Sequence, residues 1–131
     1  MYLRSLTKVE QHSFINLVAV LIMADKTIAK EEMQIFNEYL NEIGEVLPFN
    51  ENVDFDAELQ TLKSMPTFKK KRVYFELLAV AKGDNDYAEV EKELMRKVQV
   101  AFEISKQEAV EIEKYLDRLT NFYKELNKVL S

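Results

Sequence analysis

The chain has 131 residues, which fits one domain, residues 1–131, with a buried core. It contains no cysteine, so disulfides, thiol catalysis and sulfur-ligated metal sites are excluded. There are 18 basic and 23 acidic residues, and the resulting net charge of -5 disfavours nucleic acid as the main partner.

Glycine and proline are scarce, with two residues of each, whereas helix-forming Glu, Lys, Leu and Ala are abundant. We therefore predict an all-α fold, a compact bundle of about six helices. The longest apolar run, residues 17–24, is far shorter than the roughly 20 residues that span a bilayer. The first residues also lack the apolar segment of a signal peptide, so we expect a cytoplasmic protein without a membrane span.

Two helices are predicted in the first third of the chain. Thr7 and Glu10 have the spacing of a capping box, which predicts a helix from about Lys8 to the end of the apolar run. Because this run is apolar on nearly all sides, the helix should be central. A second helix should cover residues 29–43 and end at Gly44.

The sequence predicts three more helices in the middle of the chain. Asp54 or Asp56 should cap a short third helix, and a fourth should cover residues 67–82. Asp86, followed three residues later by Glu89, should cap a fifth helix that ends near residue 102.

A long sixth helix is predicted from the capping box of Ser105 and Glu108 to about Val129. Its apolar side either covers the core or extends beyond the bundle as the seam of a homodimer. The residues that could form this seam are Tyr115, Leu119, Phe122 and Leu126.

Two parts of the chain share one pattern, in which an apolar run ends near an aspartate and a glutamate follows seven residues later. Asp25 and Glu32 form the first pair, and Asp84 and Glu91 form the second, offset by 59 residues. Five apolar positions agree at the same offset. The pattern predicts two pseudo-repeated helical hairpins, followed by the long C-terminal helix.

The stretches ADKTIAKEE at residues 24–32 and AKGDNDY at 81–87, with FEIS at 102–105, resemble the tellurite-resistance TerB-like family. The resemblance covers roughly residues 10–119. It implies a small non-enzymatic module of the stress-response type, which binds a metal or works through protein partners. Carried over by position, the metal-binding residues would be Asp25, Glu32, Asp84 and Glu91, with Glu31 and Asp86 as further candidates.

The chemistry of these residues allows two interpretations. Four converging carboxylates would repel one another unless a cation bridged them, and oxygen ligands suit Ca²⁺, Mg²⁺ or Mn²⁺. Alternatively, each carboxylate only caps its own helix or complements the helix dipole, and the chain is a purely structural or adaptor domain without a metal site. Lys26 and Lys82 beside the two aspartates could then supply the compensating positive charge. Convergence of the carboxylates would favour the cation.

No catalytic constellation is evident, so we do not expect an enzyme. His12 is the only histidine, and we interpret it as a partly buried structural residue. The basic run of residues 69–72 is either a solvated helix face or a docking patch for an acidic partner, anionic lipid or nucleic acid.

Overall fold

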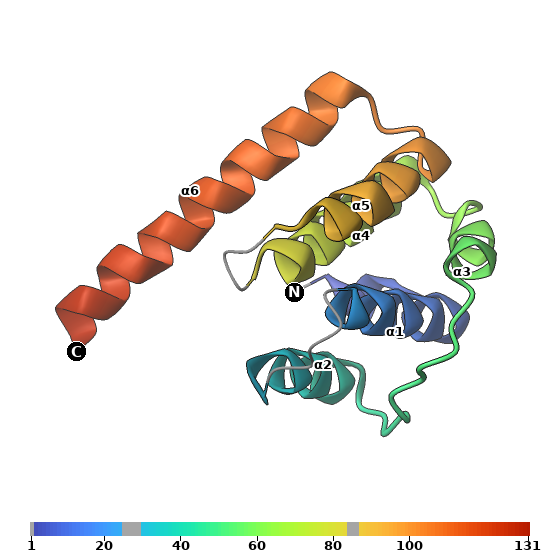
Figure 1. The fold of residues 1–131 in the computed structure, drawn as a ribbon, viewed down its shortest axis with the longest axis horizontal. Helices are drawn as coiled ribbons and strands as arrows, with labels where there is room; N and C mark the ends of the chain where they lie inside the picture. The colour runs from blue at the N-terminus through green and yellow to red at the C-terminus, as the bar shows by residue number, and fades with distance from the viewer. Residues whose placement is uncertain (1, 25–29, 84–86) are drawn as a thin grey trace.

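Six α-helices and one short 3-10 helix make up the regular structure of the computed structural model (Figure 1). It describes residues 2–24, 30–83 and 87–131, without the side chains of Lys30 and Glu31. The elements are η1 (Leu3–Ser5), α1 (Lys8–Met23), α2 (Lys30–Ile43), α3 (Phe55–Leu62), α4 (Thr67–Lys82), α5 (Glu89–Ala101) and α6 (Lys106–Leu130). The described residues contain no strand, and the all-α prediction of about six helices is confirmed.

Helix α1 is the central element, packed against α2, α3 and α4 (Figure 1). The predicted capping box is present. Thr7 Oγ1 accepts from the Glu10 backbone N–H at 3.2 Å, and Glu10 Oε1 accepts from the Thr7 N–H at 2.8 Å. Side chains around most of the helix are buried, including Phe14, Leu17 and Val18, each 0% exposed. Each such side chain contributes roughly 1.5–3 kcal/mol through burial.

Helix α2 ends where the sequence predicts, because Gly44 adopts φ 72°, a left-handed conformation that glycine reaches without steric cost. The Gly44 N–H bonds to the Asn41 carbonyl and the Glu45 N–H to the Leu40 carbonyl, both at 3.2 Å. These two bonds form a Schellman motif and satisfy carbonyls at the end of α2. The chain then leaves the helix toward α3.

Helix α3 is capped by Asp54, the first of the two predicted candidates, whose Oδ1 accepts from the Ala57 N–H at 3.1 Å. Asp56 lies in the first turn instead. Helix α4 has the predicted bounds and packs on α1, α5 and α6. The pairs α1–α2 and α4–α5 are thus the two hairpins, and they meet where α1 contacts α4.

The predicted start of the fifth helix was wrong. Helix α5 begins at Glu89 with Ala88 as its N-cap, and Glu91 Oε1 accepts from the Ala88 N–H at 3.2 Å. Glu89 therefore lies in the first turn and is not the residue that reaches back to the cap. A glutamate three residues after the N-cap can bond to the N-cap backbone whatever the N-cap side chain is. Asp86 lies outside the described residues.

Helix α6 opens with the predicted capping box, in which Ser105 Oγ accepts from the Glu108 N–H at 3.1 Å. Its first half packs on α4, with Ala109 and Leu116 buried. Every residue from Thr120 onward is exposed, and the second half projects past the other helices (Figure 1). We call residues 122–130 the free end of α6.

Candidate functional site

The proposed metal-binding residues are only partly covered by the structure. Asp25, Asp84, Asp86 and the side chain of Glu31 lie outside the described residues. Glu32 and Glu91 are described, in the first turns of α2 and α5. Among the described residues no group of three or more potential ligands gathers. The convergence of Asp25, Glu32, Asp84 and Glu91 therefore stays a prediction.

Glu91 caps its own helix, as the second interpretation of the acidic residues requires, through the bond from the Ala88 N–H. It is also only 5% exposed, although a carboxylate is ordinarily kept at the surface. Glu32 resembles it in one respect, because its Oε2 atom is shielded from solvent. Both glutamates of the repeat therefore place carboxylate oxygens in poorly hydrated surroundings.

Lys82, two residues before Asp84 in the sequence, is paired with acidic residues of α6. Its Nζ is 2.8 Å from Glu113 Oε2 and 2.8 Å from Asp117 Oδ1, both on α6. Burial by itself would lower the pKa of Lys82, but the hydrogen bonds that it donates to Asp117 and Glu113 raise the pKa above its ordinary value. Lys82 is thus charged and joins the end of α4 to the middle of α6.

Glu76 is a buried acidic residue that we did not single out from the sequence. It is 5% exposed, and it accepts from Tyr39 Oη at 2.9 Å and from the Tyr2 N–H at 3.3 Å. Burial, followed by the negative charge of Glu76, raises the pKa of Tyr39. The available signal was a single charged residue inside the apolar run of α4. These two bonds join α4 to α2 and to the N-terminal segment.

The basic run at the start of α4 is largely engaged within the molecule. Lys69 Nζ is 3.2 Å from Glu10 Oε1, and Lys71 forms an ion pair with Glu108 at the start of α6. Arg72 lies between two aromatic rings, with its Cζ 5.2 Å from the ring centres of both Tyr2 and Phe68.

His12 has a structural contact but is not partly buried as expected. It is exposed, and its Nε2 is 2.6 Å from Glu45 Oε2. The Lys8 Nζ lies 2.6 Å from the other oxygen of the same carboxylate. These contacts join the start of α1 to the segment after α2.

Exposed apolar surface is concentrated on α6. Of thirteen large hydrophobic side chains that are exposed among the described residues, seven belong to this helix. A band along one side recurs at alternating intervals of three and four residues, so it faces one direction. We call it the α6 stripe; its members are Ile112, Tyr115, Leu119, Phe122, Leu126 and Val129. Tyr115, Phe122 and Val129 are 60%, 59% and 81% exposed.

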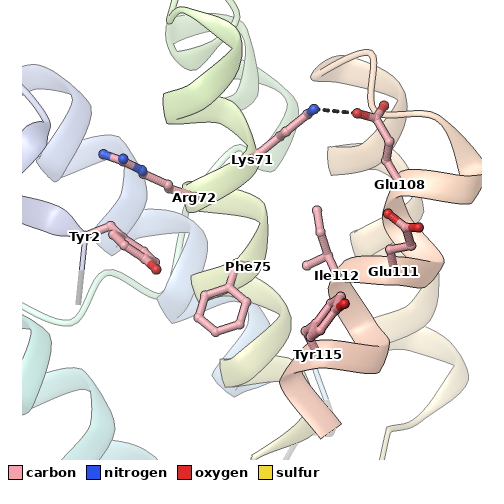
Figure 2. Close-up of a pocket in the computed structure, with 8 residues that line it drawn as sticks. All are labelled: Tyr2, Lys71, Arg72, Phe75, Glu108, Glu111, Ile112 and Tyr115. Carbon is pink, nitrogen blue, oxygen red and sulfur yellow. Dashed lines mark ion pairs between the residues drawn. The ribbon is translucent and has the colours of Figure 1, made fainter. Parts of the chain in front are cut away.

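The first part of the α6 stripe borders a pocket of about 330 Å³ between α4 and α6, which we call the α4–α6 pocket (Figure 2). Ile112 and Tyr115 face Phe75 of α4 across it, and the ion pair of Lys71 with Glu108 closes one end. Tyr2, Arg72 and Glu111 complete the lining. The pocket is therefore an apolar hollow with a charged rim, and no constellation for covalent catalysis lines it.

No protein-family model, curated protein or solved structure matches the chain. In the part of the chain that the structure describes, no helix is both long and apolar enough to cross a membrane.

Proposed function

We propose that the protein is a non-enzymatic helical module that works by binding protein partners through the α6 stripe. One observation carries the proposal. The α6 stripe begins at Ile112, which packs against the core, and continues past the bundle with Tyr115, Phe122, Leu126 and Val129 exposed. The resemblance to the TerB-like family implies the same class of module and a role in stress response, and both stay predictions.

The energetic argument rests on the size of the exposed side chains. Aromatic residues each bury roughly 150–250 Å² when fully covered, at about 25 cal/mol per Å². Phe122 and Tyr123 are 59% and 51% exposed, and Leu126, Val129 and Leu130 add to the same region. Contiguous apolar surface of this kind is typical of binding sites. Burial of this surface by a partner would therefore contribute favourable hydrophobic free energy to binding.

Site-specific photocrosslinking in the native cells tests the proposal. A photoreactive phenylalanine analogue at position 122 should give discrete protein adducts, because Phe122 lies in the proposed surface. The same analogue at position 46 is the matched control, since Val46 is 97% exposed but lies in the segment between α2 and α3. Leu126→Asp should abolish the adducts from position 122. Equal adduct patterns from the two positions would refute a binding role for the α6 stripe.

A second candidate function is the binding of Ca²⁺, Mg²⁺ or Mn²⁺ by the two Asp–Glu pairs of the repeat. Glu91 is 5% exposed and Glu32 has one oxygen shielded from solvent. Oxygen ligands suit these cations. The resemblance to the TerB-like family implies that Asp25, Glu32, Asp84 and Glu91 would hold the cation.

Thermal unfolding measures this second function directly, because a cation that binds only the native state raises its stability. We expect one of the three cations to raise the midpoint relative to EDTA, and Asp25→Asn/Asp84→Asn to remove the rise. Glu89→Gln is the matched control, since Glu89 lies in the same first turn as Glu91 but its side chain is 87% exposed. No shift at millimolar cation would leave the carboxylates as helix caps.

A further inference from the structure

The α4–α6 pocket and the free end of α6 lie along the same stripe. Ile112 and Tyr115 line the pocket, whereas Phe122, Leu126 and Val129 project from the free end. The stripe thus has a hollow at one end and a row of protruding apolar side chains at the other. A helix with this pattern can pair with an antiparallel copy of itself, because each protruding half then meets a hollow half.

We propose that the α6 stripe binds a second copy of this chain, with the two α6 helices antiparallel about a two-fold axis. This inference rests on the proposed function and names its partner. The register places Leu119 opposite Phe122 of the second copy. Tyr115 then lies opposite Leu126, and Ile112 opposite Val129. The apolar end of each α6 fills the α4–α6 pocket of the other copy.

Charges beside the stripe fit the same register. Arg118 and Glu125 lie on one edge of the stripe, two helical turns apart. In the antiparallel register, Arg118 of each copy meets Glu125 of the other, which forms two symmetric ion pairs. In a parallel pair in register the two different edges of the stripe meet, so Arg118 would face Tyr123 and Glu125 would face Leu130 of the other copy, without an ion pair. Among the described residues neither side chain forms an ion pair, and Arg118 only lies over the Tyr115 ring at 5.4 Å.

The surface available suits a weak dimer. The stripe runs from residue 112 to 129, about 26 Å along the helix. Roughly 500–600 Å² of side-chain surface per chain is covered, so the total lies near the lower limit for a specific interface. The edges carry Tyr123 and Leu130, which are 51% and 72% exposed. We therefore expect a dissociation constant in the micromolar range.

Sedimentation velocity of the full chain from about 1 to 500 µM tests the proposal. Wild type should pass from monomer to dimer. Arg118→Glu and Glu125→Arg should each weaken the dimer by at least about tenfold, because each places two like-charge pairs in the interface. An equimolar mixture of these two variants should restore association to near the wild-type level. Lys124→Glu, a charge reversal on the opposite side of α6, should change nothing.

Each outcome decides the inference. A monomer throughout the range would overturn it, and a dimer that the charge-swapped mixture does not restore would overturn the antiparallel register. Leu126→Asp, which puts a charge in the pocket of the other copy, should weaken the dimer roughly 100-fold with unchanged helical circular dichroism. A monomer that still crosslinks from position 122 to a different protein would refute the second copy as partner. The proposed function would survive that result.

Discussion

Replacing one leucine in each half of α6 tests whether the first half is packed and the free end is not, because the two changes should affect stability differently. Leu116 and Leu130 lie two heptads apart and therefore on the same side of the helix. Leu116 is 6% exposed against α4, whereas Leu130 is 72% exposed. The same substitution, leucine to alanine, is thus made once in a packed position and once in an open one.

The expected magnitudes differ because only one change leaves a cavity. A buried leucine replaced by alanine typically costs 2–5 kcal/mol, and Leu116 lies at the edge of the core, so we expect about 2–3 kcal/mol. Leu130→Ala should change the free energy of unfolding by less than about 0.5 kcal/mol, since an exposed leucine loses little and alanine favours the helix slightly.

Urea unfolding followed by circular dichroism measures both changes, with the midpoint interpreted at constant slope. Protein at about 2 µM keeps association from adding to the stability. Equal losses for Leu116→Ala and Leu130→Ala would refute the division of α6 into two halves. A loss below about 0.5 kcal/mol for Leu116→Ala would refute the packing of α6 on α4.

Three further predictions concern single local interactions, each measured by the same unfolding assay. Gly44→Ala should cost about 1–2 kcal/mol from backbone strain alone, because φ is 72° and a Cβ there meets nothing within 4 Å. Thr7→Ala should cost about 1 kcal/mol by removing the N-cap of α1. The ion pair with Lys71, and then the bond from the Ser105 N–H, lower the pKa of Glu108 to about 2. Its contribution is therefore full above pH 4.5 and is lost as the pH falls toward 2, and Glu108→Gln should remove this part of the pH dependence.

The helix boundaries that the sequence predicted correctly are those set by local hydrogen bonds. Thr7 with Glu10, Ser105 with Glu108, and Gly44 each need only neighbours within a few residues, so their patterns carry the information. The start of α5 is local too, but two overlapping patterns compete there. Both Asp86 with Glu89 and Ala88 with Glu91 have capping-box spacing. We predicted the first pair because aspartate is a much better N-cap side chain than alanine. The observed start leaves Glu91 buried and Glu89 exposed.

Burial that depends on distant residues was not predictable from the pattern. The 3-10 helix η1 is an example, with Leu3 only 1% exposed. The Leu3 N–H donates to Glu42 Oε2 at 3.0 Å, and the Leu3 carbonyl accepts from Gln11 Nε2 at 2.9 Å. Both partners belong to other helices, so the order of the first residues is a consequence of the assembled bundle. The same reason applies to the buried Glu76, whose partners are Tyr39 and Tyr2.

For the long last helix, the sequence allowed either a cover for the core or a dimer seam. In the structure its first half packs on α4 and its second half is exposed, and the dimer seam stays a prediction. With 25 residues, α6 is about 38 Å long, and its apolar period does not change along that length. The ion pairs of Lys82 with Glu113 and Asp117 hold the middle of the helix to the bundle. From Thr120 onward every residue of the helix is exposed, and short isolated helices are marginal in water. A partner on the free end would therefore stabilise the helix as well as cover its apolar side chains, which couples binding to helical order.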